Sequence, residues 1–140
     1  MIKEFQGEYR WLSNFVPCKI MLDSVEYPSV EHAYMSAKSN DIEWKKFCSN
    51  PNNKAGEVKK KSKGIKLIEN WDIIKFEVMK CCLIQKYNQE PYKTKLIQTK
   101  REHIQEGNMW GDKVWGVCLK TGNGENNLGK MIMEIRDNLL

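Results

Sequence analysis

The feature that most limits the fold of this chain is its longest candidate helix, over residues 71–87. Its apolar positions recur with the period of an α-helix, at Ile74, Val78, Cys81 or Cys82, and Ile84. Asn70 stands directly before the segment and can cap its N-terminus. We therefore expect a central core helix. Because a chain of 140 residues has the usual size of one core, we also expect a single compact domain over residues 1–140.

The opening third of the chain looks extended and rich in turns. The pair Asp23-Ser24 lies between the apolar stretches 18–22 and 25–27, which predicts a short hairpin. Ser29 is a favourable N-cap, and residues 30–38 contain no helix breaker. The hairpin is therefore expected to lead directly into a helix.

The rest of the chain continues the helical pattern. Further helices are expected over residues 41–47, over a lysine-rich stretch that ends near residue 63, and over residues 92–99 and 128–140. Residues 114–119 are typical of a small strand. The predicted fold class is therefore α+β and mostly α-helical.

Composition limits the possible functions. No apolar run approaches the roughly 20 residues that cross a bilayer, and the N-terminus lacks the apolar core of a secretory signal. A cytoplasmic protein without membrane contact is expected. Five cysteines without Cys-x-x-Cys spacing and only two histidines argue against a metal site, and no cofactor is predicted. The net charge of +5 favours an anionic partner, and the sequence assigns no oligomeric state.

Three short segments carry side chains suited to opening a bond between a sugar and a base: residues 27–34, 70–72 and 111–116. They supply a carboxylate (Glu31), a large aromatic face (Trp71) and a second carboxylate (Asp112). A carboxylate can stabilise the positive charge that develops on the sugar, while an aromatic face can bind the leaving ring.

Each of these side chains also has an ordinary structural interpretation. Glu31 falls in the first turn of a predicted helix, where a carboxylate complements the helix dipole. Asp112 can stabilise a turn, and Trp71 and Trp115 can be core aromatics. We interpret Trp115 as structural, and His32 as a packed or hydrogen-bonded residue, because it points about 100° away from Glu31 around the helix.

A series of motifs runs in order along nearly the whole chain. It comprises Leu12-Ser13-Asn14-Phe15, Pro17-Cys18, residues 27–32 and 70–72, Asp112 with Trp115-Gly116, and Gly124-x-Asn126-x-Leu128-Gly129-Lys130 with Met133 and Arg136. In their joint order and spacing these motifs resemble the NADAR (YbiA-like) superfamily.

The resemblance implies a small domain that hydrolyses N-glycosidic bonds of ribosylated heterocycles. It implies two substrate classes, namely phosphoribosylamino pyrimidine intermediates of riboflavin synthesis and ADP-ribose attached to guanine in DNA. It places Glu31, Trp71 and Asp112 at the core of the active site. The candidates for lining the site or binding phosphate are Asn14, Phe15, Lys59, Lys63 and Asn126.

We expect an ADP-ribosyl or related nucleotide adduct as substrate, such as ADP-ribosylated single-stranded DNA, because the chain is basic. Lys59, Lys63 and Lys66 would share one helical face able to meet phosphates, although a solvated face explains them equally well. Asn126 stands where a helix N-terminus could offer free N–H groups to an anion. Which of Glu31 and Asp112 activates water stays open.

Three other functions remain as alternatives. The first is an N-glycosidase of riboflavin-biosynthesis intermediates. The second is a non-catalytic module that binds ADP-ribose or NAD. The third is a plain nucleic-acid-binding protein, which would explain the lysines but not the segments that carry the two acids and the tryptophan.

Overall fold

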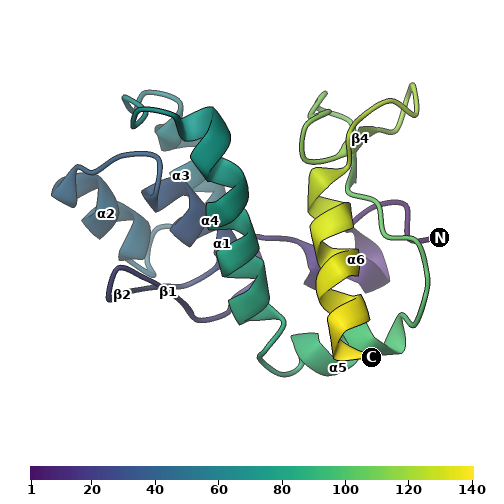
Figure 1. The fold of residues 1–140 in the computed structure, drawn as a ribbon. Helices are drawn as coiled ribbons and strands as arrows, with labels where there is room; N and C mark the ends of the chain where they lie inside the picture. The colour runs from purple at the N-terminus through teal and green to yellow at the C-terminus, as the bar shows by residue number, and fades with distance from the viewer. The chain divides into compact units, whose positions relative to one another are not determined.

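The computed structural model describes residues 1–140, and most of its ordered elements are helices (Figure 1). The α-helices are α1 (Val30–Ser36), α2 (Ile42–Ser49), α3 (Ala55–Ser62), α4 (Trp71–Lys86), α5 (Tyr92–Gln98) and α6 (Asn127–Leu139). The other elements are the 3-10 helix η1 (Gly7–Leu12) and the strands β1 (Ile20–Leu22), β2 (Val25–Tyr27), β3 (Gly107–Asn108) and β4 (Val117–Cys118). The predicted fold class, α+β and mostly α-helical, is confirmed.

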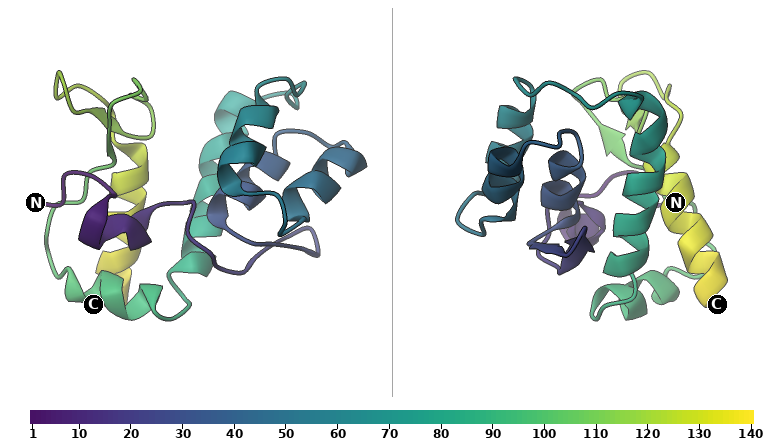
Figure 2. Two further views of the ribbon diagram at one scale, coloured as in Figure 1. Left: turned by 180° about the vertical axis from the view of Figure 1, so that it is seen from behind. Right: turned by 60° about the vertical axis from the view of Figure 1, so that its left-hand side comes forward.

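The chain divides into two compact units. The terminal unit combines Met1–Ser13 with Glu90–Leu140, and the central unit is Asn14–Gln89. In Figure 2 the N-terminal segment, in purple, belongs with α5 and α6 of the terminal unit. The single domain over residues 1–140 stays a prediction.

The predicted hairpin opens the central unit. β1 and β2 pair antiparallel, with Ile20 opposite Tyr27. Both turn residues, Asp23 and Ser24, have positive φ angles of 48° and 67°, which is the backbone of a two-residue turn whose twist matches that of the strands. Ile20 and Tyr27 are buried, and both strands contact α1.

Helix α1 is the centre of the central unit, because it contacts α2, α3 and α4. All of its residues are buried. Ser29 caps it as predicted, since its hydroxyl accepts a hydrogen bond from the His32 N–H at 3.1 Å. The helix ends at Ser36, two residues before the predicted end. Because the helix is enclosed, its polar side chains need polar partners inside the unit.

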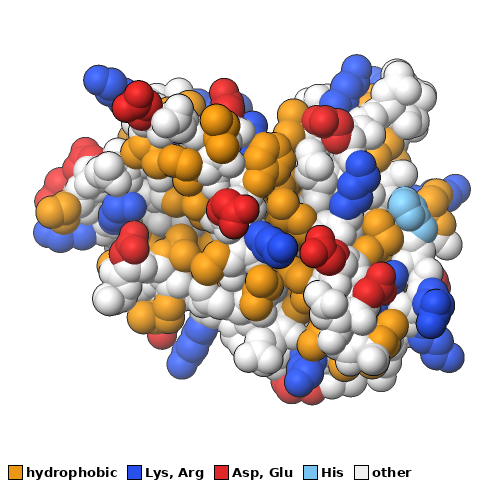
Figure 3. Space-filling model, viewed as in Figure 1, with side chains coloured by type: hydrophobic (Ala, Val, Ile, Leu, Met, Phe, Trp, Pro, Cys, Tyr) orange, Lys and Arg blue, Asp and Glu red, His pale blue; other side chains and the backbone are white.

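Helix α4 is the longest helix, as predicted, but it buries a different face. Its buried residues are Trp71, Met79, Cys82, Leu83 and Lys86. Two predicted core positions, Ile74 and Ile84, are exposed, so the prediction is wrong for them, and of the pair Cys81 and Cys82 it is Cys82 that is buried. Apolar residues occur on both sides of α4, and hydrophobic side chains appear on its visible face among charged ones (Figure 3). Helical periodicity alone therefore could not identify the buried side.

Two helices begin after an asparagine in the left-handed conformation, Asn70 (φ 63°) and Asn126 (φ 54°). Asparagine tolerates this conformation better than most residues. Asn70 is the N-cap residue of α4, as predicted, but its side chain makes no capping hydrogen bond. Its carbonyl oxygen instead accepts hydrogen bonds from the N–H groups of Ile73 and Ile74, at 2.9 and 3.0 Å.

In the terminal unit, β3 and β4 pair in parallel, with Gly107 opposite Val117. The strand predicted near residues 114–119 is shortened to β4. The reason lies in the backbone hydrogen bonds of residues 114–116, whose carbonyl oxygens accept from the start of α6 rather than from a neighbouring strand. The helix predicted over residues 128–140 is α6.

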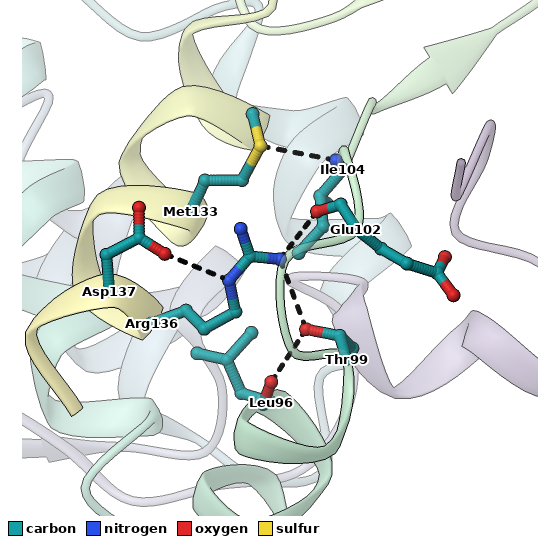
Figure 4. A network of polar contacts seen from close by, with 7 residues as sticks. All are labelled: Leu96, Thr99, Glu102, Ile104, Met133, Arg136 and Asp137. Carbon is teal, nitrogen blue, oxygen red and sulfur yellow. Dashed lines mark hydrogen bonds and ion pairs between the residues drawn. The ribbon is translucent and has the colours of Figure 1, made fainter. Parts of the chain in front are cut away.

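A buried arginine anchors α6 within the terminal unit (Figure 4). The Arg136 side chain lies 3% exposed, and its Nη1 donates to the Glu102 carbonyl oxygen at 2.6 Å and to Thr99 Oγ1 at 3.3 Å. Its Nε pairs with the Asp137 carboxylate at 3.2 Å. Thr99 in turn donates to the Leu96 carbonyl oxygen. The network connects α6 to the end of α5, which explains how a guanidinium can be buried here.

The 3-10 helix η1 lies in the region predicted to be extended, so that prediction is wrong for residues 7–12. Only Leu12 of η1 is buried, so no apolar period marks the helix. None of the helices has the length and apolar character that crossing a membrane requires.

Candidate functional site

The candidate site is a group of polar and aromatic side chains around α1 in the central unit. Glu31 occupies the first turn of α1, as predicted, and is only 7% exposed. Its backbone N–H donates to the Asn14 carbonyl oxygen at 3.0 Å, so the loop before the hairpin is held against the start of α1. The structure thus brings two of the predicted site residues together.

Trp71 is the aromatic member of this group. It begins α4, lies 6% exposed, and packs on Tyr34 with ring centroids 5.3 Å apart and a tilt of 48°. Tyr34 is three residues after Glu31 on α1, which places both on one side of that helix. Trp71 is therefore positioned near Glu31 by its contact with Tyr34.

Lys38 gives the site a charged side that the sequence analysis missed. Burial lowers its pKa from the usual value of 10.5, and the positive charges of Lys59 and Lys75 lower it further. The negative charge of Glu31 acts in the opposite direction and raises it. Lys38, just after α1, is thus acted on by the charges of Glu31 on α1, Lys59 on α3 and Lys75 on α4.

Each neighbouring lysine is held by other contacts. Lys59 places its ammonium 5.9 Å from the centre of the Phe15 ring. Lys75 pairs with the Asp72 carboxylate at 3.2 Å and is 17% exposed. The predicted residues Phe15 and Lys59 therefore lie together. Lys75 is linked to Lys59 only in that the charges of both lower the pKa of Lys38.

The predicted basic face is smaller than expected. Lys63 is exposed and forms the C-cap of α3, and Lys66 lies beyond the helix. The prediction that Lys59, Lys63 and Lys66 share one helical face is wrong, because α3 ends at Ser62. Lys63 as a substrate-binding residue stays a prediction.

Asn14 offers an unused acceptor inside the site. Its Oδ1 atom is buried and has no hydrogen-bond partner, while its Nδ2 atom donates only to the Met79 sulfur, at 3.6 Å. A buried polar atom without a partner costs free energy. This atom is therefore suited to accepting a hydrogen bond from a bound hydroxyl or amino group.

His32 has a structural role, as predicted. Its Nε2 lies 2.6 Å from the Asn53 carbonyl oxygen, which can only accept, so Nε2 carries a proton. Its Nδ1 lies 2.6 Å from the Ser29 hydroxyl. Both ring nitrogens are thus occupied in fixing the start of α1.

Asp112 belongs to the terminal unit, where it organises a turn. Its Oδ1 accepts from the N–H groups of Val114 and Trp115 at 3.1 and 3.0 Å. Its own N–H donates to the Asn108 Oδ1 at 3.0 Å. The adjoining Gly116 has no space for a Cβ, because Glu106 and Asn108 pass too close. These hydrogen bonds support the structural interpretation of Asp112. Its catalytic role stays a prediction.

Asn126, also in the terminal unit, clamps the chain before α6. Its side chain accepts from the Glu106 N–H and donates to the Ile104 carbonyl oxygen, both at 3.0 Å. The N–H groups of residues 126–128 donate to the carbonyl oxygens of residues 116, 114 and 115. The expectation that free N–H groups stand here is wrong for these three residues. Substrate binding by Asn126 stays a prediction.

Two of the missed residues had a weak signal in the sequence. Lys38 follows Glu31 by seven residues, and Lys75 follows Trp71 by four, so each pair falls on one side of a helix. This signal was ambiguous, because lysines are common on solvated helix faces. No group of three or more His, Cys, Asp or Glu side chains converges as a metal site would require.

Comparison with known proteins assigns the family. The family model described as the NADAR domain matches residues 2–140. The chain belongs to the NADAR family. The resemblance inferred from the motifs is therefore confirmed over nearly the full length.

Two similar proteins and one solved structure illustrate the range of similarity. The N-glycosidase YbiA of Escherichia coli (strain K12) is 28% identical over 140 residues, which cover 94% of this chain and 82% of that protein. A riboflavin biosynthesis protein of Vibrio vulnificus is 28% identical over 136 residues, or 92% of this chain and 35% of that protein. The NMR structure of E. coli YbiA matches with a TM-score of 0.83 at 24% identity, covering 99% of this chain and 86% of that one, and shows the shared fold.

Proposed function

We propose that this protein is an N-glycosidase that hydrolyses the bond between C1' of a ribose and a ring nitrogen of a nucleobase-like heterocycle. The observation that carries the proposal is the buried carboxylate of Glu31, whose charge acts on Lys38 in the same unit, where Lys59 and Lys75 also act on Lys38. Membership of the NADAR family and the names of the N-glycosidase relatives support it.

Cleavage of the C1'–N bond would use the carboxylate, the aromatic rings and the lysines in different ways. Breaking a C1'–N bond gives the sugar a positive charge in the transition state, and a buried carboxylate attracts that charge strongly because water is excluded. Trp71 and Tyr34 offer aromatic surface for a flat ring. Phosphate groups on the sugar would meet Lys59 and Lys75.

For the substrate, we favour an ADP-ribosyl adduct of a nucleobase, such as ADP-ribosylated guanine in single-stranded DNA. Lys59 and Lys75 act on Lys38 as positive charges, and such ammonium groups suit the phosphates of a diphosphate. Phosphoribosylated intermediates of riboflavin synthesis are the alternative, and the relative named a riboflavin biosynthesis protein supports them. A module that binds ADP-ribose or NAD without turnover is the alternative of another class.

Mass-spectrometric product analysis tests these possibilities together. The purified protein is incubated separately with ADP-ribosylated guanine in single-stranded DNA, with a phosphoribosylamino pyrimidine and with NAD. Release of free base from the first substrate is expected. Release from the pyrimidine alone would assign the metabolic reaction, and binding of ADP-ribose without release from any substrate would contradict the glycosidase.

Lys38 is expected to work in turnover as a group that loses its proton. A neutral amine can accept a proton or attack the sugar carbon, and burial favours this neutral form. Both Lys38→Arg and Lys38→Met should therefore lower kcat by about 100-fold, because a guanidinium stays protonated. The kcat of the native protein should rise with pH and reach its plateau at a lower pH than an ordinary lysine would give, because the pKa of Lys38 lies below the usual 10.5. Full activity of Lys38→Arg would show that only the positive charge is needed.

Replacing Asp112 separates its two possible roles. Asp112→Asn keeps an oxygen that can accept from the N–H groups of Val114 and Trp115, so the turn should survive. Asp112→Ala removes the acceptor and should lower the free energy of unfolding by about 1–3 kcal/mol. We expect Asp112→Asn to lower kcat by about 100-fold without changing stability. Normal turnover in Asp112→Asn would show that Asp112 only stabilises the turn and has no catalytic role.

A further inference from the structure

A loop of the terminal unit presents two large apolar side chains to solvent. Met109 is 56% exposed and Trp110 is 62% exposed, between β3 and the turn at Asp112. Tryptophan is rarely so exposed in a folded protein, because moving its ring out of water lowers the free energy. Neither side chain belongs to the proposed site around Glu31.

The base of this loop is firmly held. Asn108, 1% exposed, donates to the Asp112 carbonyl oxygen at 2.8 Å and accepts from the Asp112 N–H at 3.0 Å. Its Nδ2 atom also donates to the Glu106 carboxylate at 3.0 Å. The two residues therefore close the loop below its tip.

The chain after the tip is equally well tied. The carbonyl oxygens of residues 113–116 accept from the N–H groups of residues 125–128, at 2.7 to 3.3 Å. Only residues 109–111 extend beyond this framework, and Gly111 has a positive φ of 83° with open space around it. The exposed tip is thus short and stands on a rigid support, which reduces the entropy that binding would cost.

The charges beside the tip indicate the kind of partner. Lys113 follows the tip closely and is exposed. Asp112, between the tip and Lys113, already accepts two backbone N–H groups. An aromatic face with a cationic group nearby suits an unpaired base flanked by phosphates.

We propose that Trp110 stacks on an unpaired nucleobase of single-stranded nucleic acid, with Met109 extending the apolar contact. A single strand bound in this way can also carry the ribosylated base, which makes a nucleic acid, rather than a free nucleotide, the substrate. That assignment of substrate class rests on the proposed function. The stacking contact itself does not, because binding can be measured without turnover.

Binding of a fluorescent single-stranded oligothymidylate, measured by anisotropy, tests the contact directly. Trp110→Ala should weaken binding by about 5- to 100-fold, the range expected for loss of one stacked base. Trp110→Phe should restore most of it, and an abasic oligonucleotide of equal length should bind the native protein and Trp110→Ala alike. Lys113→Ala should reduce the salt dependence by about one phosphate contact.

Controls separate this proposal from the glycosidase proposal. Ile73→Ala removes an apolar side chain that is 73% exposed on α4 and should leave binding unchanged. Equal affinity of Trp110→Ala and the native protein for the oligothymidylate would overturn the stacking contact, and so would an equal loss on the abasic strand. If the oligothymidylate binds through Trp110 but no base is released from any substrate, the contact stands and the glycosidase fails.

Discussion

Glu31→Gln is expected to lower the rate of base release by about 100-fold or more, while leaving the fold intact. The amide has nearly the same size as the carboxylate but carries no negative charge. It therefore cannot stabilise the positive charge that develops on the ribose, and it is a poor base for activating water. Single-turnover release of base, followed by mass spectrometry, measures the effect on the chemical step.

The expected loss has a matched control on a neighbouring helix. Glu57 also lies in the first turn of its helix, α3, but it is exposed. A role limited to the helix dipole is worth about 0.3–1 kcal/mol of stability at either position. Glu57→Gln should therefore leave the rate unchanged. A normal rate in Glu31→Gln would mean that Glu31 only complements the helix dipole, and it would contradict the proposed mechanism.

The site will also respond to Glu31→Gln through Lys38. The Glu31 charge raises the pKa of Lys38, whereas burial and the other two lysines lower it. Removing the charge should therefore lower this pKa further. The residual activity of Glu31→Gln should level off at a lower pH than that of the native protein, which a pH–rate profile would detect.

Local features of the fold were predictable from the sequence. The Asp23-Ser24 turn and the Ser29 cap depend on residues within a few positions of each other, and both were found where expected. The buried face of α4 was not predictable in this way. Ile74 and Ile84 satisfy the helical period as well as Met79 and Leu83 do, so the choice depends on which side meets α1.

The site shows the same division. Motifs predict Glu31 and Trp71 as site residues, because they place a residue type at a fixed point of a turn or helix start. They do not indicate Lys38 or Lys75, whose charges act on one another although Lys75 lies on α4 and Lys38 follows α1. A lysine on a solvated face and a lysine beside a buried carboxylate look the same in a sequence.

Lys86→Met is expected to stabilise the protein at neutral pH, by an amount that depends on pH. Lys86 is fully buried in the last turn of α4, and burial lowers its pKa to about 7, with Cys18 acting in the opposite direction. In the unfolded chain the pKa returns to the usual 10.5. Between these two values the unfolded state binds more protons, so the free energy of unfolding contributed by Lys86 rises with pH.

The comparison of native protein with Lys86→Met isolates this effect, because other titrating groups are common to both. At pH 7 the ammonium costs at most about 5 kcal/mol, and methionine fills similar volume without a charge. The advantage of Lys86→Met should therefore shrink by at most about 1.4 kcal/mol per pH unit as pH rises from 7 toward 10.5. Urea unfolding across this range measures the difference.

An exposed lysine on the same helix provides the control for this titration. Lys80→Met changes the same residue type on α4 but at an exposed position, so its stability relative to the native protein should not vary with pH in this window. Parallel stability curves for Lys86→Met and the native protein would mean that Lys86 keeps its usual pKa in the fold. The buried end of α4 would then hold a full ammonium charge, and partners of Lys86 within the central unit would have to compensate its burial.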